Sequence, residues 1–346
     1  MATEIALTTV ATLVVSVGLT GLMRKLALAL GMIDVPNERS SHKAPTPRGG
    51  GVSIVGTATA ALMVLNILGA LRIELLLALI GGGVAVAMVG LLDDRHRLPA
   101  GTRLAVHLGA AIWALIFLGG LPPLRIGEQV INFGWFGYVL GVLGIVWLIN
   151  LFNFMDGIDG LAGSEAVFVA SAGALLATVT PISTDVAAAG FAFAAACCGF
   201  LYWNWPPAKI FMGDVGSGYL GYVIAVLALA STRDNPISLW VWLILGGVFF
   251  VDATVTLVRR GVRGDRVHQA HRSHAYQWLA RRWGSHRRVT VAVSMVNVIW
   301  LLPCAFLATL HPDRAVAIVV VALVPLVALA IAAGSGRREN ATLKDR

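Results

Sequence analysis

Charge is scarce in this sequence. Only 13% of the 346 residues are Asp, Glu, Lys or Arg, whereas 58% are hydrophobic. A soluble domain is typically about 25% charged. The apolar excess extends along the whole chain and does not mark a single anchor. These properties exclude a soluble globular enzyme, a disordered chain and a fibrous protein, and they predict a polytopic membrane protein.

Cysteine is nearly absent. The three cysteines, Cys197, Cys198 and Cys304, lie inside apolar runs. This spacing fits neither a disulfide framework nor a zinc site. We therefore interpret them as small buried hydrophobic residues.

Apolar runs long enough to cross a bilayer recur through the chain. A spanning helix needs about 20 mostly apolar residues, and backbone inside lipid must satisfy its own hydrogen bonds. We expect an all-α fold with ten or eleven transmembrane helices that form a single domain over residues 1–346. The expected spans are 5–23, 50–70, 73–92, 104–121, 135–152, 164–180, 186–204, 217–231, 237–257, 289–309 and 314–333.

Basic residues are concentrated in alternate loops. If the N-terminus lies outside, 22 of the 26 Lys and Arg residues fall in the inner loops and the C-terminal tail. This asymmetry satisfies the positive-inside rule and predicts a C-terminus in the cytoplasm. It also accounts for the net charge of +8 without nucleic-acid binding, which we do not expect. The inner loops are 24–49, 93–103, 153–163, 205–216 and 258–288.

Acidic residues gather at the inner ends of the apolar runs. Acids at membrane depth are costly and by default indicate function. Clustered carboxylates there either bind a hard divalent cation such as Mg²⁺, which prefers oxygen ligands, or move a proton. Spacing alone leaves open which acid has which role. The five acids are Asp93, Asp94, Asp156, Asp159 and Asp214.

The last inner loop is rich in histidine and arginine. It holds His268, His271, His274 and His286 together with nine arginines. A zinc site favours a nearby carboxylate or cysteine. Arginine beside histidine instead suits phosphate oxygens, through charge-assisted hydrogen bonds. A loop that is basic only for topological reasons is the alternative.

Five motifs, in order along nearly the whole chain, resemble the polyprenyl-phosphate N-acetylhexosamine-1-phosphate transferases of glycosyltransferase family 4. They are PTPRGGG, LLDD, NLFNFMDGIDGL, FLYWNWPPAKIFMGDVGSG and HQAHRSHAYQ. The last motif is similar to the O-antigen-initiating branch, which takes UDP-linked N-acetylated (deoxy)hexosamines. It departs from the histidine triplet of the muramoyl-pentapeptide branch.

The resemblance implies a transferase whose active site is formed by the inner loops, on the cytoplasmic face of the bacterial inner membrane. Undecaprenyl phosphate attacks a UDP-sugar, UMP leaves, and the lipid diphosphate sugar initiates O-antigen or another cell-envelope polysaccharide. The implied cofactor is Mg²⁺, with Mn²⁺ as a substitute. Phosphoryl transfer needs mainly positioning and charge neutralisation. The implied partners are the two substrates and membrane lipid, and formation of a homodimer is left open.

Site roles follow from the resemblance, residue by residue. Asp93 is similar to the acid that deprotonates the lipid phosphate in the family's proposed mechanism. The implied metal ligands are Asp214, Asn153 and Asp94. The implied catalytic residues are Asp93, Asp94, Asp156, Asp159, His271 and His274. The implied substrate-binding residues are Lys43, Arg48, Asn153, Asn204, Phe211 and Arg272.

A proton- or ion-coupled transporter is the alternative function. It would place its ionisable groups near the bilayer midplane and often shows internal repeats. Here the acids lie at the inner ends of the spans, and no repeat is evident. Asp252 is a separate case inside the ninth apolar run. Two interpretations of it stay open: it orients a partner from another helix, or it makes an ordinary helix contact.

Overall fold

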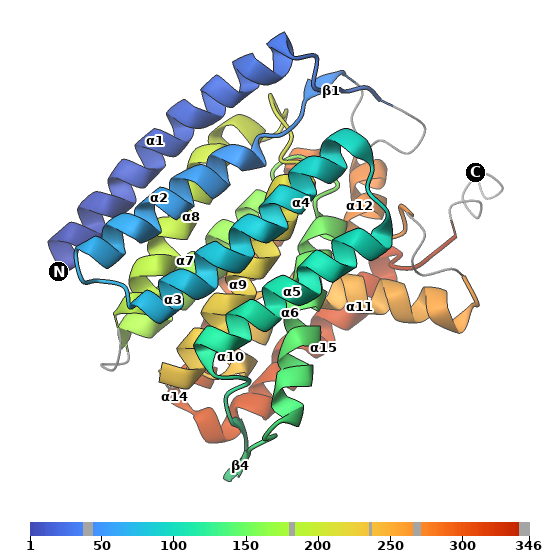
Figure 1. Ribbon diagram of the computed structural model, residues 1–346. Helices are drawn as coiled ribbons and strands as arrows, with labels where there is room; N and C mark the ends of the chain where they lie inside the picture. Colours follow the sequence, from blue (N-terminus) through green and yellow to red (C-terminus); the bar gives the residue numbers. More distant parts are fainter. Residues whose placement is uncertain (37–43, 180–183, 235–236, 266–270, 339–346) are drawn as a thin grey trace.

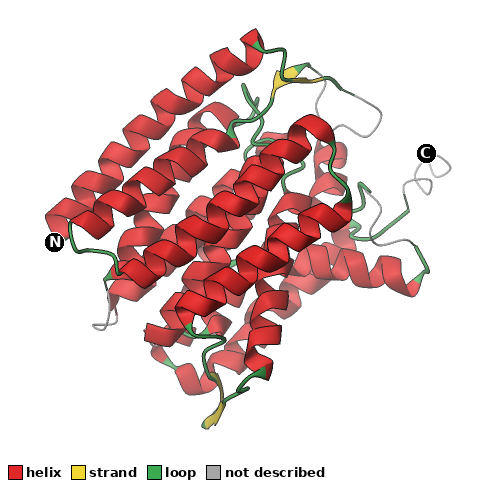
Figure 2. Cartoon of the chain, in the orientation of Figure 1, coloured by secondary structure: helices red, strands yellow, loops and turns green. Residues whose placement is uncertain are grey.

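The computed structural model describes residues 1–36, 44–179, 184–234, 237–265 and 271–338. Helices make up nearly all of its regular structure, as expected for an all-α protein (Figures 1 and 2). The described strands form two short antiparallel hairpins at opposite ends of the helical bundle. The hairpins are Ile33–Asp34 (β1) with Thr46–Pro47 (β2), and Leu124–Ile126 (β3) with Gln129–Ile131 (β4).

The first five helices form a row in Figure 1, in which α3 and α4 follow each other along one line. They are α1 (Ala2–Ala29), α2 (Gly51–Ile67), α3 (Ile73–Leu77), α4 (Gly83–His96) and α5 (Ala100–Leu118). A π-helical segment, η1 (Ala78–Gly82), joins α3 to α4. Residues 73–96 therefore form one continuous apolar span.

The second part of the chain supplies the remaining helices. They are α6 (Phe136–Met155), α7 (Leu161–Val179), α8 (Asp185–Asn204), α9 (Asp214–Asp234), α10 (Leu239–Leu245), α11 (Gly247–Val262), α12 (Ala275–Trp283), α13 (His286–Val296), η2 (Asn297–Leu301), α14 (Leu302–Leu310), η3 (Pro312–Arg314) and α15 (Ala315–Ala333). Here η2 is π-helical and continues α13 into α14, while η3 is a 3-10 turn.

Nine helices of the described chain are long and apolar enough to cross a membrane. Two other expected spans depart from a straight helix of that length. The helix α2 has 17 residues, and α10 and α11 meet at a bend of 80°. The bend lies at Gly246–Gly247, beyond which α11 projects sideways from the bundle (Figure 1). The architecture is that of a multi-pass membrane protein, and a count of eleven crossings stays a prediction.

The helix α9 is the centre of the bundle. The apolar window of this helix is 94% buried by its neighbours, and α6 and α4 pack closely along it. A Cβ added at Gly221 would collide with the Leu148 carbonyl of α6. Small residues allow helix backbones to approach each other in membrane proteins. The short expected span 217–231 is therefore the most enclosed one.

Gly90 allows α4 to approach the beginning of α9. A Cβ at Gly90 would collide with the backbone carbonyl of Asp214. Asp94 lies one helical turn after Gly90, because a turn takes 3.6 residues. This close contact therefore decides where the Asp94 carboxylate lies relative to the N-terminus of α9.

Gly90→Ala is expected to destabilise the protein by roughly 1–3 kcal/mol, the usual cost of overpacking, because the new methyl group collides with α9. The measurement is the Tm of the purified protein in detergent. Gly109→Ala is the matched control, since Gly109 is also helical but has nothing within 4 Å of an added Cβ. Equal Tm values for the two variants would contradict the close contact.

Candidate functional site

Asp94 caps the first turn of α9. Its Oδ1 accepts a hydrogen bond from Asp214 N (3.0 Å), and its Oδ2 accepts one from Val215 N (3.3 Å). Two amides that a helix N-terminus leaves unpaired are satisfied in this way. Gly213 precedes the helix with φ +79°, and a side chain there would collide with the Asp94 carboxylate. The LLDD and FMGD motifs are therefore joined directly across 120 positions of sequence.

Arg48 lies between two of the predicted carboxylates. Its Nη2 is 2.7 Å from Asp94 Oδ1 and 3.0 Å from Asp214 Oδ1. The backbone holds Arg48 in place, because Phe211 N donates to Pro47 O (2.8 Å). Burial acts to lower the pKa of Arg48, but the charges of Asp94 and Asp214 outweigh burial and raise the pKa.

Asp93 pairs with Arg103, a cation that the sequence analysis did not single out. Arg103 Nη1 is 2.6 Å from Asp93 Oδ2 and 3.9 Å from Asp214 Oδ2. Leu98 N donates to Asp93 Oδ1 (2.6 Å), so both oxygens of Asp93 are engaged. In the sequence, Arg103 is one of three arginines between LLDD and the next apolar run, and nothing in its spacing separates it from the other two.

Asp156 is a third carboxyl group that interacts electrostatically with Arg48. It directly follows α6 and is partly buried. Burial raises the pKa of Asp156 well above its usual value, the charge of Asp214 raises it further, and Arg48 opposes both effects. The end of α6 is tied to α9 because Asn153 Nδ2 donates to Ser217 Oγ (3.1 Å). The site therefore holds more carboxyl groups than arginines, and a bound cation would favour their ionised form.

The donor set at this site fits a magnesium ion. In the described chain, no group of three His, Cys, Asp or Glu is arranged as a complete metal site. However, Mg²⁺ is usually held by only one or two carboxylates together with substrate phosphates and water. Asp94 and Asp214 each place one oxygen within 3.0 Å of the same Arg48 nitrogen, so the two carboxylates already surround one positive charge.

Asp159 and Asn204 hold two loops of the site together. Asp159 Oδ2 accepts from Ala208 N (3.0 Å). Asn204 Oδ1 accepts from Gly160 N (2.9 Å), and Asn204 Nδ2 donates to Ile210 O (2.9 Å). The turn after α6 is thus fastened to the segment before α9. These contacts favour a structural role for both residues, in which they hold the two loops of the site in place.

His286 is a second residue for which the sequence analysis proposed no role. Its Nδ1 is 3.2 Å from Asp159 Oδ1, and Thr290 Oγ1 donates to Asp159 O (2.9 Å). The first turns of α13 therefore pack against the Asp159 turn. Membership of the histidine-rich loop was the only signal for His286 in the sequence.

The two described histidines of the HQAHRSHAYQ motif have different surroundings. His271 is partly buried, and its Nδ1 is 3.0 Å from Ser273 Oγ. His274 is buried and stacks on Tyr276, with ring centroids 5.7 Å apart. Burial, followed by the charges of His274 and Arg260, lowers the pKa of His271 to about 4. His271 is therefore neutral near pH 7.

The structure describes two of the three remaining predicted substrate-binding residues. Lys43 lies outside the described residues. Arg272 is partly buried beside His271, and its carbonyl accepts from Arg281 Nη2 (2.9 Å). Phe211 is partly buried and pairs with Arg48 through the backbone. The structure thus brings the acids of three motifs together with Arg48, while the role of each predicted site residue stays a prediction.

Known proteins resemble this chain over most of its length. The model of glycosyl transferase family 4 matches residues 76–232. A probable undecaprenyl-phosphate N-acetylglucosaminyl 1-phosphate transferase from Bacillus subtilis is 28% identical over 82% of this chain and 79% of its own length. The decaprenyl-phosphate N-acetylglucosaminephosphotransferase of Mycolicibacterium smegmatis is 30% identical over 84% of this chain and 79% of its own length.

The muramoyl-pentapeptide branch is also represented among the relatives. A phospho-N-acetylmuramoyl-pentapeptide-transferase from Chloroflexus aggregans is 30% identical over 73% of this chain and 70% of its own length. The family motifs expected from the sequence are thus accompanied by similarity along most of the chain. The chain belongs to glycosyl transferase family 4, within the polyprenyl-phosphate N-acetylhexosamine-1-phosphate transferase superfamily.

Proposed function

We propose that this protein transfers an N-acetylhexosamine 1-phosphate from a UDP-sugar to undecaprenyl phosphate and releases UMP. The observation that carries the proposal is the convergence of Asp94, Asp156 and Asp214 around Arg48. In the proposed reaction, an oxygen of the lipid phosphate forms a bond to the β-phosphorus of the donor. The bond between that phosphorus and UMP breaks. Relatives named as transferases of this kind support the reaction over ion-coupled transport.

The proposed cofactor is Mg²⁺, held by Asp94, Asp214 and Asn153, and Mn²⁺ suits the same hard oxygen donors. When bound, the metal would neutralise the diphosphate charge that shifts toward UMP. Arg48 and Arg103 place two guanidinium groups beside the same carboxylate, that of Asp214. Guanidinium groups bind phosphate oxygens through charge-assisted, often bidentate, hydrogen bonds. Both arginines are therefore proposed to contact the phosphates of the substrates.

Asp93 stays a candidate base for the lipid phosphate. Its two oxygens already accept from Arg103 and from Leu98 N. A phosphate monoester has its second pKa near 6 and is therefore largely ionised at neutral pH, so the reaction does not depend on a strong base. These contacts favour a role for Asp93 in orienting Arg103 toward the phosphates.

The proposed donor is a UDP-linked N-acetylated hexosamine or deoxyhexosamine. UDP-N-acetylglucosamine is the first candidate, because the names of the Bacillus subtilis and Mycolicibacterium smegmatis relatives specify N-acetylglucosamine. The loop HQAHRSHAYQ supports the deoxy derivatives as a second candidate. The same loop argues against a muramoyl-pentapeptide. The lipid product is proposed to initiate O-antigen or another cell-envelope polysaccharide.

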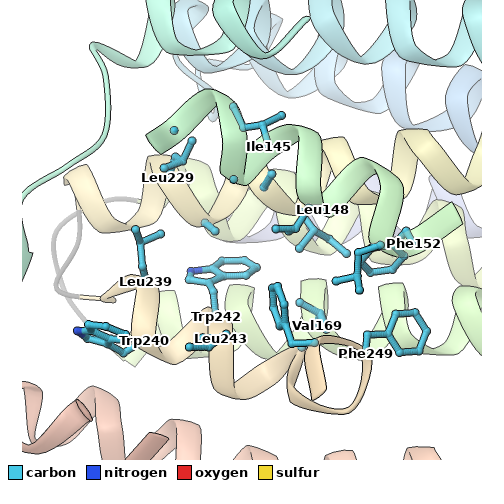
Figure 3. Close-up of a pocket in the computed structure, with 18 of the residues that line it drawn as sticks. Ile145, Leu148, Phe152, Val169, Leu229, Leu239, Trp240, Trp242, Leu243 and Phe249 are labelled. Atoms are coloured by element: carbon cyan, nitrogen blue, oxygen red, sulfur yellow. The ribbon is translucent and has the colours of Figure 1, made fainter. Parts of the chain in front are cut away.

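An apolar cavity beside the site supports the lipid acceptor. The cavity has a volume of about 300 Å³ and lies between α6, α7, α9, α10 and α11. Figure 3 shows Leu148 and Phe152 of α6 on one side of it and Trp242 and Phe249 on the other, with the rings of Phe152 and Phe249 in contact at one end. Phe152 directly precedes Asn153, so one end of the cavity lies next to the carboxylates. We propose that the part of the polyprenyl chain nearest its phosphate occupies this cavity, with the phosphate toward Asp94.

The site is proposed to face the cytoplasm from the bacterial inner membrane. The proposed orientation, with the N-terminus outside, rests on the 22 of 26 Lys and Arg residues on the inner side. UDP-sugars are charged and need an aqueous compartment. The carboxylates, Arg48 and the histidine loop all belong to segments on that same side.

The direct test of the function measures UMP release by the purified protein with undecaprenyl phosphate, Mg²⁺ and a panel of UDP-sugars. UMP is expected only when lipid and metal are both present. Chelation with EDTA should stop release, and added Mg²⁺ should restore it. Absence of UMP with every UDP-N-acetylhexosamine and deoxy derivative would contradict the transferase proposal.

Asp214→Asn is expected to lower kcat by at least about 100-fold, comparable to removal of one key electrostatic group in other active sites. The variant keeps the size of the side chain but removes the charge that faces Arg48 and the proposed metal. Asp313→Asn is the matched control, because Asp313 is exposed in the turn between α14 and α15. Activity of Asp214→Asn near that of the control would exclude Asp214 as a metal ligand.

His271 is expected not to titrate between pH 6 and pH 8. Because the pKa of His271 is lowered to about 4, the side chain is neutral above about pH 5 and becomes charged only in more acidic solution. The pH profiles of kcat/KM for the wild type and for His271→Gln should therefore have the same shape in this range, whatever their height. Loss of an inflection between pH 6 and pH 7 in the variant would contradict this assignment.

A further inference from the structure

Asp252 caps α12, the helix that follows the histidine loop, whose described residues before α12 are 271–274. It lies in α11 and is buried. Its Oδ1 accepts from Ala275 N (2.7 Å), and its Oδ2 accepts from Tyr276 N (3.1 Å). These are the first two amides of α12, which a helix leaves unpaired at its N-terminus. Of the two interpretations of Asp252 left open by the sequence, these contacts support orientation of a partner from another helix.

The turn after α15 binds the same carboxylate. This C-terminal turn comprises Gly334–Gly336. Ser335 Oγ donates to Asp252 Oδ1 (3.0 Å), and Ser335 O accepts from Arg259 Nη1 (2.7 Å). Gly336 N donates to the carbonyl of Ser273 (2.7 Å). One turn of three residues therefore contacts both α11 and the histidine loop.

The C-terminal turn fits tightly into this position. Ser335 is fully buried. Gly336 has φ +71°, and a Cβ there would lie 2.9 Å from Arg259 Cβ and 3.2 Å from Thr256 O. An L side chain at Gly336 would thus be strained in conformation and crowded against α11. This leaves the turn little freedom to move relative to the loop.

We propose that the C-terminal turn positions the histidine loop for binding of the donor diphosphate. Ser335 of this turn and Asp252 of α11 are the positioning residues. This inference rests on the proposed transferase function. It assigns a role to a segment that lies after the last of the expected transmembrane helices, and outside all five family motifs.

Two routes connect the C-terminal turn to the site. Gly336 holds the backbone of Ser273, whose Oγ is 3.0 Å from His271 Nδ1. A partner on one ring nitrogen fixes the orientation of an imidazole and leaves the other nitrogen for a ligand. The second route runs through Asp252 to Tyr276, whose hydroxyl donates to Phe154 O (3.0 Å). Phe154 directly follows Asn153, a proposed metal ligand.

Two truncations test the proposal. A chain that ends after Ala333 loses every contact of the C-terminal turn, whereas a chain that ends after Arg338 keeps all of them and is the matched control. The measurements are kcat, the KM for the UDP-sugar, the KM for undecaprenyl phosphate, and Tm. The shorter chain should raise the KM for the UDP-sugar by roughly tenfold, as loss of an outer contact does in other sites. Its KM for the lipid should equal that of the control.

Point variants keep the test valid if the shorter chain does not fold. Ser335→Ala should raise the KM for the UDP-sugar about fivefold, since it removes one hydrogen bond to a charged group. Ser335→Thr keeps the hydroxyl and should restore most of the wild-type KM. Unchanged kinetics in Ser335→Ala, or an equal rise of both KM values together with a lower Tm, would overturn the positioning role. Failure of the wild type to release UMP would instead refute the proposed function.

Discussion

The cap that Asp94 places on the first turn of α9 is the contact on which the rest of the site depends. It joins the end of α4 to the most buried helix of the bundle. It requires the close approach at Gly90 and the positive φ of Gly213. Arg48 reaches Asp94 and Asp214 together only because this cap brings their carboxylates to one place.

Charge balance around this cap explains what the site is suited to bind. Carboxylates at the end of a membrane-embedded bundle are costly unless cations compensate them. Arg48 and Arg103 compensate Asp94, Asp93 and Asp214 in part. The pKa of Asp156 is raised, first by burial and then by the charge of Asp214. In the proposed function, a divalent metal would add positive charge, and the metal and the two arginines would bind the phosphates of the two substrates. The scarcity of charge elsewhere in the chain makes this concentration distinctive.

Much of the architecture could be predicted from the sequence, because apolar length and basic loops follow directly from the physics of the bilayer. Each expected span corresponds to a helix or a helix pair, but the 80° bend between α10 and α11 was not expected. That bend depends on packing around Gly246 and Gly247, to which hydropathy is insensitive.

The site was predictable to the extent that its residues lie in motifs. The sequence placed Asp94, Asp156 and Asp214 on one side, but it contained no signal for the pairing of Asp93 with Arg103 or of Asp159 with His286. The first pair forms across the short turn between α4 and α5, whose geometry the sequence does not specify, and the second forms between distant segments that are brought together only by tertiary packing. A single sequence does not distinguish a basic residue on the surface from a basic residue in the site.

We propose that a metal and the donor diphosphate bind together beside Asp94 and Asp214. Electron paramagnetic resonance of Mn²⁺ bound to the purified protein, with UDP-N-acetylglucosamine or the corresponding deoxy sugar nucleotide present, tests it most directly. Phosphorus hyperfine coupling to the bound Mn²⁺ is expected in the wild type, and this signal should be lost in Asp214→Asn. Bound Mn²⁺ without phosphorus coupling, or the same coupling in Asp214→Asn, would contradict joint binding of metal and diphosphate at these residues.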